Sequence, residues 1–145
     1  MKLKILTSAL LLMLSIEKVH ASSEVDCLAK IIYHESRGQS DLEKRSVGTV
    51  VLNRRGHGSF PKTVCGVMRQ PRQFSWYRKN PSISDKKEYK KSKNLAHLML
   101  SNNRYRVSHL HKATFFHSGR RGFGNSNLRK LGRVGDFVFY RIKNR

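Results

Sequence analysis

A glutamate at position 35 is the residue whose type and placement best suit catalysis. Leu28, Ile31 and Ile32 precede it at helical spacing, so Glu35 continues an apolar stripe that faces the interior of the domain. Partial burial raises the pKa of a carboxyl, which keeps a protonated fraction near neutral pH and suits a group that acts first as an acid and then as a base. The alternative is an ion pair with Arg37 or another basic side chain, which would lower the pKa of Glu35 instead.

The other acidic residues offer no obvious second catalytic carboxylate, although most glycosidases use two. Four of them lie at expected helix starts, where interaction with the helix dipole is a sufficient role, and one lies in an expected turn. These residues are Asp41, Glu43, Asp85 and Glu88 at the helix starts and Asp136 in the turn. The sequence therefore favours a mechanism with a single acid.

The histidines do not form a recognisable metal site. His34 and Glu35 begin like a zinc-protease motif, but the residue four positions after His34 is Gly38 rather than histidine. The group formed by His109, His111 and His117 lacks typical ligand spacing, and two cysteines alone make a poor zinc site. We therefore predict no metal and no other cofactor.

The elements expected to position these residues give an α+β domain that is mainly helical. Ser23 to Asp26 has the form of a capping box, Gly38 suits the end of a helix, and Ser40 with Glu43 suits the start of the next helix. The periodicity predicts helices over 24–37, from 41 through the valines at 47, 50 and 51, briefly around 64–68, and over 85–103, with short strands at 113–117 and 137–140. Residues 118–135 are expected to form a loop rich in Gly, Arg and Asn.

The N-terminal segment has the pattern of a secretory signal peptide. Lys2 and Lys4 precede an apolar run from Ile5 to Ile16, and small residues follow near Ala21. We therefore divide the chain into a signal peptide at 1–21 and one domain at 22–145, which places the protein in the periplasm or outside the cell. A membrane anchor is the alternative, but a run of about twelve residues is short for a bilayer.

The charge balance points to a polyanionic partner. The 145 residues carry 30 Lys+Arg against 9 Asp+Glu, a formal net charge of +21. Removal of Lys2, Lys4, Lys18 and Glu17 with the signal peptide would leave +19. Acidic wall polymers, lipopolysaccharide, anionic lipid and nucleic acid all suit this charge, and export makes nucleic acid the weaker candidate.

The two cysteines, Cys27 and Cys65, are expected to form one disulfide, because an even number in an exported chain favours pairing over free thiols. A loop of 38 positions closed in this way stabilises a small domain by roughly 3 to 4 kcal/mol in the chain-entropy model.

Several blocks of the chain resemble the SleB/CwlJ-type cell-wall hydrolases. The blocks are Cys27-Leu-Ala-Lys-Ile-Ile-Tyr33-His-Glu35-Ser-Arg37-Gly38, Val50-Val-Leu-Asn53-Arg54, Phe60-Pro-Lys-Thr-Val-Cys65, Gln73-Phe74-Ser75-Trp76, Ala113-Thr-Phe-Phe-His117 and Val134-Gly-Asp-Phe-Val-Phe139-Tyr140-Arg141. They occur in the family's order and cover most of the chain after residue 21, so their joint occurrence is more specific than any single block.

The resemblance implies a small lysozyme-like domain that cleaves the glycan strands of peptidoglycan, with Glu35 as the catalytic glutamate. It also implies lytic transglycosylase chemistry, in which one glutamate protonates the glycosidic oxygen and then assists attack by the muramic acid 6-hydroxyl. The positions expected to bind substrate are Tyr33, Asn53, Gln73, Phe74, Ser75, Trp76, His117 and Tyr140. Structural roles are the alternative for three of them, with Asn53 capping a helix, Tyr140 packing in the core and His117 satisfied locally.

Two features depart from the family pattern. The family usually has a Trp-containing segment after the His117 block and a His in its last motif. In this sequence the nearest counterparts are Phe123 and Phe137. The strong positive charge is also not part of the pattern. The alternative function is a non-catalytic basic module that binds lipopolysaccharide or nucleic acid through Arg, Lys, Trp76 and Tyr77.

Overall fold

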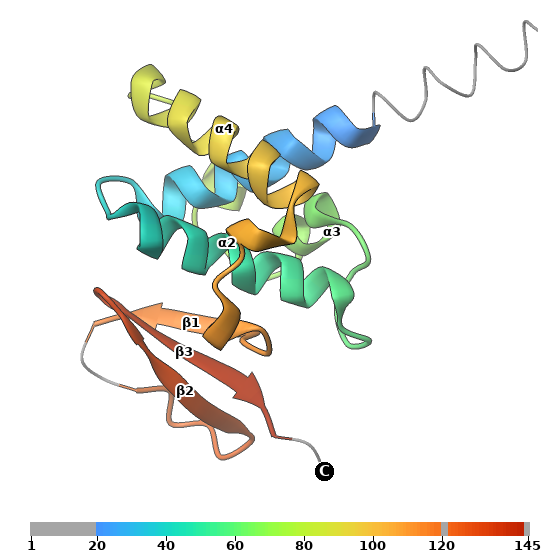
Figure 1. Cartoon of the computed structure of the whole chain (residues 1–145), viewed down its shortest axis with the longest axis vertical. Helices are drawn as coiled ribbons and strands as arrows, with labels where there is room; N and C mark the ends of the chain where they lie inside the picture. Colours follow the sequence, from blue (N-terminus) through green and yellow to red (C-terminus); the bar gives the residue numbers. More distant parts are fainter. Residues whose placement is uncertain (1–19, 120–121, 144–145) are drawn as a thin grey trace, which may run out of the picture.

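The computed structural model describes residues 20–119 and 122–143 and shows a helical layer packed on a small sheet (Figure 1). The N-terminal helix is described over residues 20–36, and the other helices are α2 (Asp41–Gly56), α3 (Val64–Arg69) and α4 (Lys86–Ser101). The described residues also form three short 3₁₀ helices: η1 (Tyr77–Lys79) between α3 and α4, and η2 (Asn103–Tyr105) and η3 (Ser108–Leu110) between α4 and β1. The strands are β1 (Phe115–Ser118), β2 (Leu128–Val134) and β3 (Phe137–Ile142). The expected mainly helical α+β class is confirmed.

Helix α2 lies between the other helices and the sheet (Figure 1). Ser40 and Glu43 form the predicted capping box at its start, and Gly38 adopts a positive φ of 81° in the turn before it. The valines at 47, 50 and 51 are fully buried in the core. Gly48 allows α4 to approach closely, because a Cβ at this position would lie 2.6 Å from the Met99 sulfur.

The N-terminal helix is confirmed, but Ser23 does not cap it as predicted. Residues 20 to 36 are helical, and the Ser23 hydroxyl donates to the His20 carbonyl within the helix. The expected signal peptide at 1–21 lies almost entirely outside the described residues. No helix in the described ranges is long and apolar enough to cross a membrane.

The sheet has the antiparallel order β1-β3-β2, and β2 corrects the prediction of a loop over 118–135. The apolar residues Leu128, Leu131 and Val134 recur every third position instead of every second, because the register shifts between Lys130 and Gly132. A bulge of this kind interrupts the alternation by which strands are identified in a sequence. The remaining side chains of β2 are largely basic, as is common on the edge strand of a sheet.

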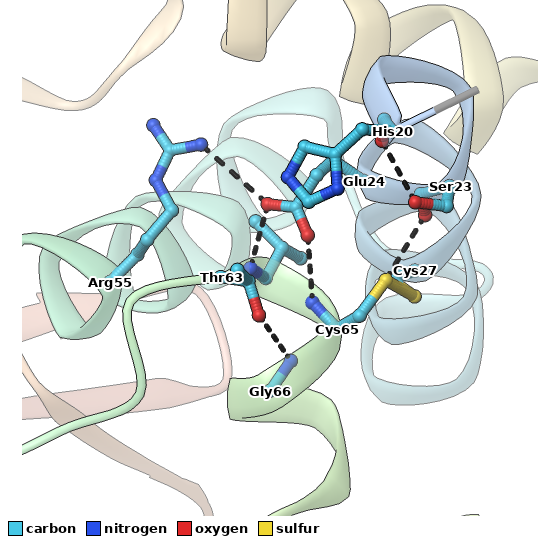
Figure 2. Close-up of a disulfide and its surroundings, with 9 residues drawn as sticks. His20, Ser23, Glu24, Cys27, Arg55, Thr63, Cys65 and Gly66 are labelled. Carbon is cyan, nitrogen blue, oxygen red and sulfur yellow. Dashed lines mark hydrogen bonds and ion pairs between the residues drawn. A yellow bond between two sulfur atoms is a disulfide. The ribbon is translucent and has the colours of Figure 1, made fainter. Parts of the chain in front are cut away.

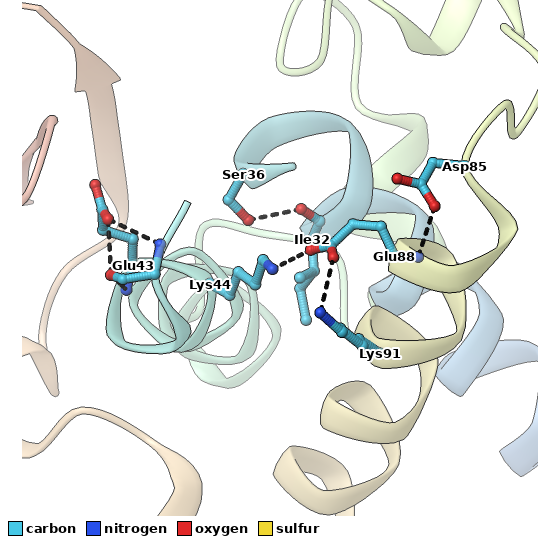
Figure 3. A network of polar contacts seen from close by, with 8 residues as sticks. Ile32, Ser36, Glu43, Lys44, Asp85, Glu88 and Lys91 are labelled. Atoms are coloured by element: carbon cyan, nitrogen blue, oxygen red, sulfur yellow. Dashed lines mark hydrogen bonds and ion pairs between the residues drawn. The ribbon is translucent and has the colours of Figure 1, made fainter. Parts of the chain in front are cut away.

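Glu43 ties the sheet to the start of α2. Figure 3 shows this side chain at the start of the helix. Its carboxylate accepts hydrogen bonds from the Ser40 backbone, the Ser40 hydroxyl and the Asp136 backbone N–H in the β2–β3 turn. Gly135 in this turn has a φ of +53°, and a Cβ there would lie 1.9 Å from Glu43 Oε1. These bonds lower the pKa of Glu43, so it is a structural carboxylate that stays ionised.

Cys27 and Cys65 form the predicted disulfide, which joins the N-terminal helix to α3 (Figure 2). Next to it, the Glu24 carboxylate accepts hydrogen bonds from the backbone N–H groups of Val64 and Cys65 at 2.7 and 3.2 Å. The Thr63 hydroxyl accepts another from Gly66. A disulfide and a buried carboxylate therefore hold α3 in place, and with it the start of the loop that carries the aromatic residues 74–77.

Candidate active site

Glu35 lies in the last turn of the N-terminal helix and is half-buried. The indole Nε1–H of Trp76 donates a hydrogen bond of 2.7 Å to its Oε1. Burial raises the pKa of Glu35, and this effect exceeds the lowering by the Trp76 hydrogen bond and by the positive charge of Arg54. The alternative of an ion pair with Arg37 is not formed, since the Arg37 guanidinium donates to the hydroxyls of Tyr33 and Ser84.

Trp76 is held in position by neighbouring aromatic rings. The His34 ring lies 4.4 Å from the Trp76 ring, centroid to centroid, with 30° between the planes. Phe74 lies 5.8 Å away and is buried. Burial, followed by the charges of Arg37 and Lys30, lowers the pKa of His34, which favours the neutral imidazole in this stack. Trp76 therefore presents its N–H to Glu35 from a fixed orientation.

Arg54 brings a buried positive charge to the site from α2. It is 4% exposed, and its Nε donates to the Thr114 carbonyl at 2.6 Å, just before β1. Its guanidinium lies 5.3 to 5.9 Å from the ring centroids of Phe60, Phe74 and Phe115. Burial lowers the pKa of Arg54 to about 10, against the opposing attraction of Glu35. No direct ion pair joins Arg54 to Glu35 among the ion pairs of the described residues.

Sequence reasoning did not single out Arg54 or His34, although a signal for Arg54 was present. Val47, Val50, Val51 and Arg54 follow the same helical spacing that places Glu35 at the end of its own apolar stripe. Glu35 and Arg54 carry opposite charges, and each continues the apolar stripe of its own helix. This pattern predicts that the two side chains lie near each other in the interior. Nothing comparable marks His34, whose position depends on the fold of the loop around Trp76.

The polar and aromatic residues predicted to bind substrate occupy different places. Gln73 is half-buried and Ser75 is exposed, both beside Trp76 in the same loop. His117 and Tyr140 form a second cluster on the sheet, with His117 Nε2 3.1 Å from the Tyr140 hydroxyl. The exposed Phe123 ring covers this pair at centroid distances of 4.9 and 5.3 Å.

Two of the predicted positions make well-defined structural contacts. The ring of Tyr33 is buried, and its hydroxyl accepts hydrogen bonds from Arg37 and from the Asp85 backbone at the start of α4. The Asn53 amide donates to the carbonyls of Leu110 and Ala113 at 2.7 and 2.8 Å. The substrate-binding role of either residue stays a prediction.

Histidine, cysteine, aspartate and glutamate side chains do not gather into a metal site within 20–119 and 122–143, where no group of three or more is suitably arranged. Glu35, Trp76 and Arg54 bring together a partly desolvated carboxyl, an indole donor and a buried cation.

Comparisons with known proteins identify relatives by sequence and by fold. Spore cortex-lytic enzymes from Bacillus cereus and Oceanobacillus iheyensis are 39% and 34% identical over 56 residues. The matched segment is 39% of this chain but only 22% and 20% of those relatives, so it spans about a fifth of their length.

Solved structures of two catalytic domains share the fold. They are those of the Bacillus cereus SleB protein, with a TM-score of 0.61, and of the germination-specific lytic transglycosylase SleB from Bacillus anthracis, with a TM-score of 0.63. Each is 24% identical to this chain and covers 80% of it, and the match covers 88% and 92% of the two domains. The expected lysozyme-like architecture is thereby confirmed.

A model of the cell wall hydrolase family matches residues 38–140. The match starts three residues after Glu35 and includes Arg54, Trp76 and the His117 cluster. Because it extends over more than half of the sequence, the chain belongs to the cell wall hydrolase family.

Proposed function

We propose that the protein cleaves the glycan strands of peptidoglycan as a lytic transglycosylase, with Glu35 as its single acid and base. The observation that carries the proposal is the partly desolvated Glu35 carboxyl, hydrogen-bonded to Trp76 on one oxygen. The names of the relatives, spore cortex-lytic enzyme and lytic transglycosylase, support the same reaction class.

The first step requires a protonated Glu35. Burial raises its pKa, and the Trp76 hydrogen bond engages Oε1, so Oε2 is the oxygen that carries the proton. Glu35 donates this proton to the glycosidic oxygen as the bond from that oxygen to the anomeric carbon breaks. The departing sugar leaves with a neutral hydroxyl, and the anomeric carbon becomes electron-poor.

The second step requires the same residue as a carboxylate. Glu35 accepts the proton of the muramic acid 6-hydroxyl while that oxygen bonds to the anomeric carbon, which gives a 1,6-anhydro sugar without water. The Trp76 donor and the Arg54 charge both stabilise the ionised form. Burial therefore favours the acid of the first step, and two neighbouring groups favour the base of the second.

A mechanism with Glu35 alone is supported by the structural contacts that three other glutamates make. Glu24 binds the start of α3, Glu43 binds the β2–β3 turn, and Glu88 pairs with Lys44 and Lys91 (Figure 3). None of these contributes to the shifted pKa of Glu35. A two-carboxylate mechanism would need a second acid free to reach the same sugar.

The surroundings of Glu35 offer contacts suited to sugars. The half-buried Trp76 presents part of an aromatic ring, and Gln73 and Ser75 present polar groups beside it. The exposed Phe123 offers another ring at the separate His117 cluster on the sheet. Amphipathic sugar rings use both kinds of contact in binding grooves. We assign Gln73, Phe74, Ser75, Trp76, His117 and Tyr140 to the groove or its support on this basis.

The proposal includes export, with a signal peptide at 1–21 and the catalytic domain at 22–145. The disulfide between Cys27 and Cys65 supports an oxidising compartment, such as the periplasm or the cell exterior. The peptidoglycan substrate lies in the same compartment.

Mass spectrometry of peptidoglycan digested by the oxidised protein tests the reaction type. Muropeptides with anhydro ends are expected. Products with reducing ends would show that the enzyme cleaves the glycosidic bond by hydrolysis and not by transglycosylation. The absence of any product from folded, disulfide-bonded protein would favour the non-catalytic basic module instead.

A further inference from the structure

Three adjoining hollows lie on the flank formed by one side of α2, the η2–η3 segment, the first half of β2 and the end of β3. Their volumes are about 400, 680 and 320 Å³, and His111 lines all three. The first shares Asn53 and Arg106 with the second, and Lys112 and Arg141 with the third. The three therefore form one continuous surface, which we call the basic flank.

The basic flank is strongly and uniformly cationic. Arginine, lysine or histidine side chains line every hollow, and no Asp or Glu lines any of them among the residues that the structure describes. Basic side chains that cluster on one surface produce a positive potential that attracts anions. None of these cations takes part in the proposed chemistry at Glu35.

Arg106 is the central cation and lacks a partner for part of its guanidinium. The side chain is half-buried, and its Nε is fully buried without a hydrogen-bond partner in the described part of the chain. Burial and the nearby positive charge of Arg55 lower its pKa, so the site disfavours this charge as long as no anion is present. An anion bound against the accessible part of the guanidinium would supply the missing negative charge.

The backbone that carries the basic flank is firmly attached to α2. Thr49 accepts a hydrogen bond from the Val107 N–H, and Asn53 holds the carbonyls of Leu110 and Ala113. Arg45 Nε donates to the Tyr105 carbonyl at 2.8 Å. A preorganised set of donors loses less entropy on binding than a mobile one.

The residues that line the hollows favour some kinds of polyanion over others. Guanidinium groups bind phosphate through paired hydrogen bonds, and the flank has several of them. No Phe, Tyr or Trp lines the described hollows, so bases of single-stranded nucleic acid find only the smaller histidine rings to stack on. Leu52 and Val107 are buried and Leu42 alone is an exposed large apolar side chain there, so the flank has no broad apolar face for a lipid surface.

We propose that the basic flank binds a linear phosphodiester polymer of the cell wall, with successive phosphates in the adjoining hollows and one of them on Arg106. Binding there would hold the enzyme at the wall independently of the catalytic site. The inference goes beyond the proposed reaction and does not depend on it.

Binding of a short poly(glycerol phosphate) chain to the oxidised protein at low ionic strength tests the proposal. The triple variant Arg106→Gln, Lys112→Gln, Arg129→Gln removes at least one cation from each hollow. The control variant Lys86→Gln, Lys87→Gln, Lys90→Gln removes the same charge from exposed positions of α4. We expect the flank variant to bind at least about tenfold more weakly and the control to stay within about twofold of the unaltered protein.

Equal weakening of the two variants would overturn the proposal, because it would mean attraction by net charge alone. Tighter binding of single-stranded DNA or of anionic phospholipid vesicles than of the polymer would also overturn it. Circular dichroism checks the fold, and the double variant Lys112→Gln, Arg129→Gln, both at exposed positions, repeats the test without altering Arg106. Cleavage of polymer-free peptidoglycan is expected to be unchanged in the flank variant, which separates this site from Glu35.

Discussion

Replacing Arg54 with methionine tests the electrostatic description of the active site. Arg54 is 4% exposed, donates to the Thr114 carbonyl and is surrounded by three phenylalanine rings. Methionine fills a similar volume without the charge, whereas alanine would leave a cavity. Lysine keeps a positive charge but loses the planar guanidinium.

The expected change in the free energy of unfolding of Arg54→Met is small, because two contributions oppose each other. The lowering of the Arg54 pKa to about 10 corresponds to a desolvation cost of about 3 kcal/mol, which the variant lacks. The variant loses a hydrogen bond from a charged donor, about 1.5 to 3 kcal/mol, and ring contacts of about 0.5 to 1 kcal/mol. We therefore expect a net change within about 2 kcal/mol, against a loss of about 3 kcal/mol or more for Arg54→Ala.

The effect on activity has a defined sign. The charge of Arg54 lowers the pKa of Glu35, so its removal raises that pKa further. Since the first step uses protonated Glu35, activity of Arg54→Met is expected to persist to higher pH, while Arg54→Lys keeps a profile close to the original. Urea unfolding and the pH dependence of peptidoglycan solubilisation measure the two effects. Destabilisation of Arg54→Met by more than about 4 kcal/mol, or loss of its activity at a lower pH, would refute the reasoning.

Three further predictions concern the disulfide and the Glu35 pair. Serine at both Cys27 and Cys65 is expected to lower the free energy of unfolding by about 4 kcal/mol for a separation of 38 residues, and an unchanged urea midpoint would contradict this. Trp76→Phe keeps a ring beside His34 but removes the donor to Glu35, so we expect about tenfold lower turnover and activity that persists to higher pH; unaltered kinetics would exclude a role for the donor. Burial raises the folded-state pKa of Glu35, so ionisation destabilises the fold as pH rises through that value, and Glu35→Gln is expected to raise the urea midpoint at neutral pH but not in acid. An equal gain at both pH values would point to a cause other than ionisation.

The sequence predicts the helical part of the fold because its signals are local. The capping box at Ser40 and Glu43, the turn at Gly38 and the valine stripe of α2 each depend on residues a few positions apart. Strand β2 was not predicted, because the shift between Lys130 and Gly132 breaks its alternation and only pairing with β3 reveals it. Ser23 was wrongly predicted to cap a helix that already includes it.

The active site also has some features that local sequence patterns predict and others that depend on the overall fold. The burial of Glu35 follows from its stripe on one helix, and the structure agrees with it. The hydrogen bond from Trp76 joins residues 41 positions apart in the sequence, across a loop whose path no local pattern specifies. The stack of His34 on Trp76 depends on the same path. Long-range contacts of this kind become visible only once the fold is known.

The most direct test of the central claim compares the release of soluble muropeptides from purified peptidoglycan by three proteins. These are the oxidised protein, Glu35→Gln, and Asp41→Asn as a control that neutralises an exposed carboxyl in the first turn of α2. We predict anhydro-muropeptides from the oxidised protein and from Asp41→Asn, and none from Glu35→Gln with its fold and disulfide intact. Undiminished release by Glu35→Gln would contradict the assignment of Glu35 as the catalytic acid.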